Sequence, residues 1–190
     1  DNGSIDGYSG ATALGIAALE GMNGINSNFS WGQTFFGQIP GSIGETSTFL
    51  ILLAGAYMVY TKIASWRIIF GTLAGMIVMS SALNLIGSDT NPMFAIPWYW
   101  HLTIGSFAFG LVYMATEPVS AANTNMGRWI YGISIGVIVV LIRVINPAFP
   151  EGMMLAILFA NLLAPAIDFT ITSLNTSCLL YTSDAADDLL

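Results

Sequence analysis

Five apolar segments dominate the chain from residue 46 onward, and each is long enough to cross a lipid bilayer, which takes about 20 helical residues. Charged residues fall only at or near the ends of these segments. Because lipid offers no hydrogen-bond partners, the backbone groups of such segments must be paired within a helix. Transmembrane helices are therefore predicted at residues 46–64, 67–87, 98–116, 127–146 and 152–171.

The composition also predicts an all-α integral membrane protein. Hydrophobic residues make up 55% of the chain and charged residues 8%, against about 25% charged residues in soluble domains. One cysteine is too few for a disulfide framework, and four basic residues with a net charge of −7 argue against a nucleic-acid partner. The sequence has no glycine-rich dinucleotide-binding motif and no phosphate-binding P-loop, so we do not expect NADH to bind to this chain.

The basic residues predict how the chain is oriented. Lys62 and Arg67 share the first connection between spans, and Arg128 lies two spans later on the same side. Arg143 alone falls toward the opposite side, where we expect its side chain to reach the lipid headgroups. Cytoplasmic connections are enriched in Lys and Arg. Residues 1–44 are therefore predicted on the periplasmic or external side of the membrane.

The chain is predicted to have three parts. Residues 1–44 form an external loop with one short helix near 12–22, and residues 45–172 form the five-helix membrane domain. Residues 173–190 form a tail. From Ser177 to Leu190 this tail resembles translated sequencing-adapter sequence, so we exclude it from the fold prediction.

Small residues predict close packing between spans. Gly71 and Gly75 in the second segment, and Gly132 and Gly136 in the fourth, recur at a spacing that lets helices approach closely. Pro165 predicts a kink or a break in the last span, because proline cannot donate a backbone hydrogen bond.

Polar residues at the ends of the spans have structural explanations. Ser42 and Glu45 have the spacing of a capping box at the start of the first span. Glu117 precedes Pro118, so we expect it to end the third span in water. His101 follows three aromatic residues, which predicts a place at the membrane interface.

The first dozen residues carry the main candidate site. Asp6, Ser9, Gly10, Ala11 and Thr12 form a short polar stretch ahead of an apolar segment. One interpretation is structural, with Ser9 or Thr12 as a helix N-cap. The other is that the Thr12 hydroxyl, accessible where a loop meets a helix start, carries a cofactor. A hydroxyl in this place serves either purpose.

The string Asp-x-x-Ser-Gly-Ala-Thr, which ends at Thr12, resembles the motif at which a flavin transferase joins FMN through its phosphate to a threonine. That motif occurs in NqrB, a membrane subunit of the Na+-translocating NADH:quinone oxidoreductases, and in RnfD, its counterpart in the related Rnf complexes. Four further stretches resemble the C-terminal half of NqrB, and they lie at residues 41–46, 114–121, 146–152 and 159–168. Glu117 stands where we expect Asp in that family.

The resemblance implies a six-subunit, Na+-pumping respiratory complex that passes electrons from NADH to a quinone. It implies covalent FMN on Thr12, within a motif formed with Asp6, Ser9, Gly10 and Ala11. NqrB proteins also hold riboflavin and contribute to the quinone site, and the sequence assigns no residues to either. The implied partners are the other subunits, the flavin transferase, quinone, Na+ and membrane lipid.

Asp168 is the candidate for a Na+ pathway. An acid within a membrane segment is a functional candidate, and the resemblance implies a role in Na+ uptake. Asn161 and carbonyl groups freed by Pro165 are the expected partners, because hard cations prefer oxygen ligands. The alternative is that Asp168 lies at the headgroup boundary and ends the last span.

Two other functions fit parts of the sequence. One is that of RnfD in an Rnf complex, which exchanges electrons with ferredoxin instead of quinone. The other is half of a small-solute channel or transporter, since such folds also use glycine-rich helix starts. A transporter has no need of a flavin-attachment motif, so the stretch that ends at Thr12 favours a redox role.

Overall fold

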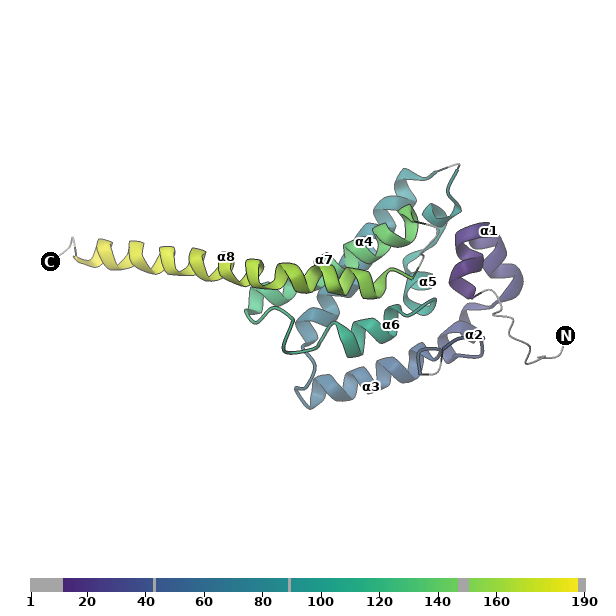
Figure 1. Ribbon diagram of the computed structural model, residues 1–190, viewed down its shortest axis with the longest axis horizontal. Helices are drawn as coiled ribbons and strands as arrows, with labels where there is room; N and C mark the ends of the chain where they lie inside the picture. The colour runs from purple at the N-terminus through teal and green to yellow at the C-terminus, as the bar shows by residue number, and fades with distance from the viewer. Residues whose placement is uncertain (1–11, 43, 89, 147–150, 188–190) are drawn as a thin grey trace.

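The computed structural model describes residues 12–42, 44–88, 90–146 and 151–187, and residues 177–187 by the course of their backbone alone. Every element of regular structure in these ranges is helical, which confirms the predicted all-α class (Figure 1). The helices are α1 (Ala13–Asn28), α2 (Trp31–Phe36), α3 (Thr48–Tyr60), α4 (Trp66–Ile86), η1 (Pro92–Ala95), α5 (Trp98–Thr103), α6 (Phe107–Phe109), η2 (Gly110–Met114), α7 (Asn125–Ile145) and α8 (Met153–Asp187).

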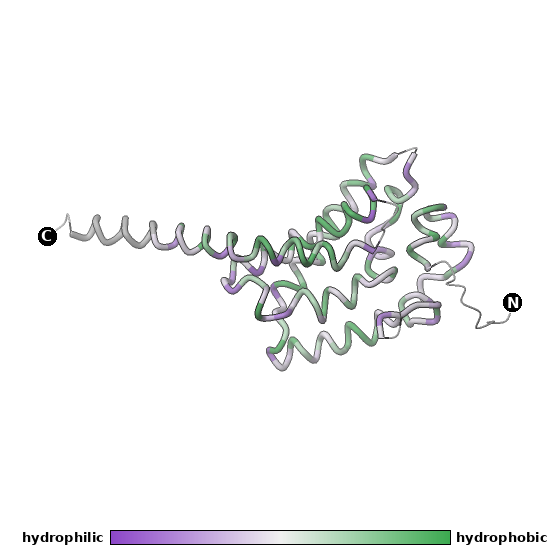
Figure 2. The backbone as a smooth tube through the Cα atoms, viewed as in Figure 1, coloured by the Kyte–Doolittle hydropathy of each residue, from purple (hydrophilic) through white to green (hydrophobic). Residues whose placement is uncertain are grey.

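Three helices in the described part of the chain are long and apolar enough to cross a bilayer. They are α4, α7 and the Met153–Thr176 part of α8. Figure 2 shows apolar residues along these helices and hydrophilic residues mainly at the connections. Helix α3 has 13 residues and spans only about 20 Å at about 1.5 Å per residue, less than a hydrocarbon core of about 30 Å. The helices indicate a multi-pass membrane protein, with three of the five predicted spans present as single long helices.

Helices α4 and α7 make the most extensive contact between two elements of the fold. The contact is lined by four glycines, Gly71, Gly75, Gly132 and Gly136. A Cβ atom added to Gly132 would lie 2.6 Å from the carbonyl oxygen of Ile68 on the facing helix. The two backbones therefore touch directly, and the predicted close approach of these spans is confirmed.

The segment predicted as a third span, residues 98–116, is broken. Helix α5 ends at Thr103, and the chain resumes helical structure in α6 and the π-helical η2. Gly105 lies at the break with φ of +70°, a left-handed conformation that favours glycine. A Cβ atom at Gly105 would also lie 2.8 Å from Cδ2 of Leu14. The prediction of one continuous helix here is wrong, because hydropathy does not report the backbone angle that ends the helix.

Helix α8 continues through Pro165 as one helix (Figure 1). The predicted break is therefore absent. Proline is tolerated inside membrane helices when small local adjustments satisfy the carbonyl group that it leaves without a donor.

The part before α3 contains more helix than the sequence predicts. Helix α1 extends past residue 22 to Asn28, and it bends at Gly21, where φ is +63°. Helix α2 follows, opened by a capping box in which Ser30 and Gln33 bond reciprocally. Two short helices thus occupy a region predicted to be mostly loop.

The predicted capping box at Ser42 and Glu45 is wrong. The backbone N–H of Glu45 donates to the carbonyl oxygen of Ser42 at 3.3 Å, which closes a turn ahead of the helix. The N-cap of α3 is Ser47, whose hydroxyl accepts from the N–H of Leu50. The turn leaves the side chains of Ser42 and Glu45 free to border a cavity.

Candidate functional site

Thr12 begins helix α1. Its backbone is extended, and its Oγ1 accepts a hydrogen bond of 3.1 Å from the backbone N–H of Gly15. The N-cap interpretation of Thr12 is therefore confirmed. Thr12 is nevertheless exposed, so the hydroxyl remains accessible from outside the protein.

The rest of the predicted attachment motif lies outside the described residues. This applies to Asp6, Ser9, Gly10 and Ala11, whose predicted roles stay predictions.

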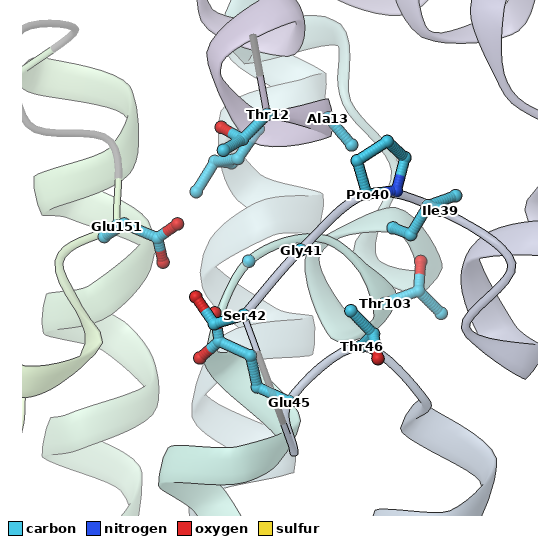
Figure 3. Close-up of a pocket in the computed structure, with 12 residues that line it drawn as sticks. Thr12, Ala13, Ile39, Pro40, Gly41, Ser42, Glu45, Thr46, Thr103 and Glu151 are labelled. Atoms are coloured by element: carbon cyan, nitrogen blue, oxygen red, sulfur yellow. The ribbon is translucent and has the colours of Figure 1, made fainter. Parts of the chain in front are cut away.

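A cavity of about 330 Å³ adjoins Thr12. It brings Thr12 together with Ser42 and Glu45, about 30 residues later in the chain, and with Glu151, which precedes α8. Figure 3 shows oxygen-bearing side chains around one open space, those of Thr12, Ser42, Glu45 and Glu151. Three of the stretches that resemble the same family thus contribute residues to this cavity: the motif that ends at Thr12, residues 41–46 and residues 146–152.

The carboxylate of Glu151 is held by the break in the third segment. Its Oε2 accepts from the backbone N–H of Ser106 at 3.1 Å and from the Ser106 hydroxyl at 2.9 Å. Thr103, at the end of α5, and Gly105, within the break, line the same cavity. The break therefore places both backbone and side-chain polar groups beside Thr12.

Arg143 stabilises this break from the centre of the fold. Its guanidinium is fully buried and donates to the carbonyl oxygens of His101 at 2.8 Å, Ile104 at 3.2 Å and Glu151 at 3.4 Å. It also lies 5.7 Å from the centre of the Phe107 ring. Carbonyl groups that a helix break frees inside a membrane protein need such partners.

The prediction that Arg143 reaches the headgroups is wrong, and sequence reasoning did not identify its role. A signal was present in the spacing, because Gly136, Val139, Val140 and Arg143 recur at helical intervals on the buried face of α7. A basic residue on the apolar face of a helix is predicted to meet polar groups in the interior.

His101 is also buried, so its side chain packs inside the protein and does not face lipid. Its predicted place at the depth of the membrane interface stays a prediction. It lies in α5 just before the break, and its backbone carbonyl accepts from Arg143.

Asp168 binds the start of α7. Its carboxylate accepts from the N–H of Asn123 at 2.6 Å, and from the N–H and the hydroxyl of Thr124 at 3.1 Å and 2.6 Å. Asn161, predicted as its partner, accepts instead from the hydroxyl of Tyr131. Among the described residues, no three His, Cys, Asp or Glu side chains gather where they could hold a metal ion.

Glu117 lies in a polar turn after η2. Its carboxylate accepts from the N–H of Val119 at 2.9 Å and from the N–H and the hydroxyl of Ser120. These hydrogen bonds, led by the one from the Ser120 hydroxyl, lower the pKa of Glu117 from its ordinary value.

The fold and the site define a multi-pass membrane protein with an exposed threonine hydroxyl at a helix N-terminus beside a cavity. The sequence profile of the NQR2, RnfD, RnfE family matches residues 2–176, and the chain belongs to this family. The chain is 62% identical over 173 residues to the NqrB subunit of the Na(+)-translocating NADH-quinone reductase of Azotobacter vinelandii. It is 58% identical over 177 residues to that of Neisseria meningitidis, and 56% identical over 173 residues to that of Pseudomonas aeruginosa.

These matches cover 90% of this chain and 43% of each relative, so the chain spans less than half the length of the curated relatives that it matches. The resemblance seen in the sequence motifs is confirmed at the level of the family.

Proposed function

We propose that this chain belongs to the flavin-carrying membrane subunit of a Na+-translocating NADH:quinone reductase, with FMN joined to Thr12 through a phosphoester. The observation that carries the proposal is the exposed Thr12 hydroxyl at the N-terminus of α1, beside a cavity of about 330 Å³. That volume lies within the usual range of small-molecule sites.

The start of α1 suits a phosphate. The backbone N–H groups of Ala13 and Leu14 have no partner within the helix, because the first N–H groups of any helix lack one. Together with the helix dipole, such groups favour a bound anion. The residues present therefore fit a phosphoester on Thr12.

The cavity suits the remainder of the cofactor. The carboxylates of Glu45 and Glu151 and the hydroxyl of Ser42 can accept hydrogen bonds from the ribityl hydroxyls or the ring N–H of a flavin. Bound FMN supplies one- and two-electron transfer, while this chain positions it and sets the polarity around it.

The remaining features follow from the proposed membership in the complex. If α3 and the broken segment, residues 98–116, each cross the membrane, the chain has five membrane crossings. Residues 1–44 then lie on the periplasmic side of a bacterial inner membrane. The relatives are named as subunits of a Na(+)-translocating NADH-quinone reductase. The proposed partners are the other subunits, the flavin transferase, quinone and Na+, and riboflavin is a proposed second cofactor without assigned residues.

Asp168 is proposed on the Na+ pathway. Its carboxylate and the Thr124 hydroxyl place three oxygen atoms at the N-terminal end of α7, and hard cations prefer oxygen ligands. The positively charged Arg128 guanidinium attracts the same carboxylate electrostatically. Na+ would therefore bind there weakly, as a transported ion must.

The proposal is tested in a chimera in which residues 2–176 replace the matching residues of the Azotobacter vinelandii relative, expressed with the rest of the complex and its flavin transferase. The denatured subunit should show flavin fluorescence on a gel, and Thr12→Val should abolish it. Thr46→Val, the same change at another threonine of the cavity, should leave it unchanged. A dark band for the unmutated chimera, with an active transferase present, would contradict the proposal.

The electron acceptor distinguishes a role in a quinone reductase from a role in an Rnf complex. The named relatives are quinone reductase subunits, which favours quinone reduction over ferredoxin chemistry. Quinone-dependent NADH oxidation by the chimera is the expected result, and its absence in a complex with full flavin content would favour the Rnf alternative.

A further inference from the structure

A second cavity, of about 560 Å³, lies at the opposite end of the helices from Thr12. It is bordered by the connection from α3 to α4, by the turn after η2 and by the first turn of α7. Arg128 lines this cavity, whereas Arg143 lies at the break beside the Thr12 cavity. The two arginines are 15 residues apart on α7, which is about 22 Å at about 1.5 Å per residue.

The second cavity is strongly basic. It is lined by three of the four basic residues of the chain, Lys62, Arg67 and Arg128. The Arg67 guanidinium lies over the Trp66 ring at 4.9 Å. Arg128 uses its Nε to donate to the carbonyl oxygen of Ala122, and a guanidinium has four further N–H donors.

Glu117 is the one carboxylate among the described residues that line this cavity. Glu117 is already engaged by the N–H groups of Val119 and Ser120 and by the Ser120 hydroxyl. The lining thus carries three cations and one carboxylate, and Asp168, outside the lining, offsets part of the charge of Arg128.

Ser65 is a second, independent observation that points to a ligand. Its Oγ is buried, it lines this cavity, and it has no hydrogen-bond partner among the described residues. Ser65 is the N-cap residue of α4, a 21-residue helix, yet its side chain makes no capping hydrogen bond. A buried hydroxyl without a partner costs free energy, and its position at a helix N-terminus favours an anionic acceptor.

We propose that this cavity binds the phosphate group of an anionic phospholipid headgroup. The cavity is larger than a phosphate ion needs, and its rim carries Tyr60, Ile63 and Trp66, which are 83%, 64% and 44% exposed. Amphipathic aromatic rings gather at the depth of the headgroups. Basic pockets between membrane helices on the cytoplasmic side bind anionic lipid heads.

The experiment uses the complete chimeric complex, delipidated in mild detergent and titrated with phosphatidylglycerol or phosphatidylcholine while bound lipid is counted by native mass spectrometry. Phosphatidylglycerol should bind more tightly. Lys62→Gln and Arg67→Gln should each weaken its binding about fivefold, and together about 25-fold, as expected for basic residues near a membrane surface. The charge-conserving pair Lys62→Arg and Arg67→Lys should bind within about twofold of the unmutated complex.

Ser65→Ala tests the geometry separately from the charge. It should weaken phosphatidylglycerol binding without lowering the thermal stability of the delipidated complex, because no hydrogen bond of Ser65 Oγ is lost.

Three results would overturn the proposal. One is equal binding of the two lipids, and another is unchanged phosphatidylglycerol binding in the Lys62→Gln, Arg67→Gln double variant. The third is displacement of phosphatidylglycerol by millimolar inorganic phosphate, which would assign the cavity to a soluble phosphate. Flavin fluorescence is read on the same samples, so failure here is distinguishable from failure at Thr12.

Discussion

The guanidinium of Arg143, on α7, donates a 2.8 Å hydrogen bond to the backbone carbonyl of His101, 42 residues earlier in the chain. This bond, with those to Ile104 and Glu151, fixes a helix break inside the fold. The break in turn holds the residues that border the cavity beside Thr12.

Replacing Arg143 should destabilise the protein strongly. Arg143→Met leaves the buried carbonyl groups of His101 and Ile104 without donors, a loss of about 3 kcal/mol or more. Thermal unfolding of the delipidated chimeric complex measures the change, with Arg67→Met, at a half-buried arginine that lies over the Trp66 ring, as the comparison. Equal melting temperatures for the two variants would mean that the buried guanidinium does not support the break.

The two roles of Thr12 should be separable. Asparagine caps helices as well as threonine does but has no hydroxyl to esterify. Thr12→Asn should therefore keep the melting temperature and lose covalent flavin, whereas Thr12→Val should lose both the flavin and about 1 kcal/mol of stability. Flavin retained on Thr12→Asn would place the attachment at another residue.

The contact between α4 and α7 should not tolerate even a methyl group. Gly132→Ala places its Cβ against the carbonyl oxygen of Ile68 and should destabilise the protein by about 1–3 kcal/mol. Gly32→Ala is the control, since a Cβ at Gly32 meets no atom of the described residues within 4 Å. Gly32→Ala should be neutral, or stabilising by up to about 1 kcal/mol. Similar melting temperatures for both variants would contradict direct backbone contact.

The turn at Glu117 should depend on pH. Hydrogen bonds to the carboxylate lower its pKa below the ordinary value of 4.5 in the folded protein. The stabilisation is therefore complete above the ordinary pKa and is lost as the pH falls through the lowered one. Hydrogen exchange at Val119 and Ser120, corrected for intrinsic rates, should speed up in that acidic range. In Glu117→Gln this pH dependence should vanish, and its persistence would point to another titrating group.

Asp168 should affect both structure and Na+ dependence. Asp168→Asn weakens the hydrogen bonds at the start of α7, which should lower stability by about 1 kcal/mol. If Na+ passes this carboxylate, the KM for Na+ should rise about tenfold or more, since charged hydrogen-bonding partners contribute about 1.5–3 kcal/mol. A lower melting temperature with an unchanged KM would leave Asp168 a helix cap alone.

The sequence predicted the parts of this fold that depend on local pattern. Apolar length identified α4, α7 and α8, and glycine spacing identified the close contact between α4 and α7. The break at Gly105 was missed, because apolar residues continue across it and only the backbone angle ends the helix.

The sequence identified the central residue of the candidate site but not which distant residues lie beside it. Thr12 was identified from its motif, but its proximity to Glu45 and Glu151 depends on the way distant segments pack. The cluster of Lys62, Arg67 and Arg128 was interpreted as an orientation signal, although the fold also gathers these residues around one cavity.

The direct backbone contact between α4 and α7 has a mechanical consequence. Where the four glycines meet the facing backbone, no side chain of either glycine pair can change rotamer to let the helices slide. The pair should move as one rigid body. Any motion that links the two ends of this protein must then occur in the segments around the pair, in α3, in the broken segment or in α8.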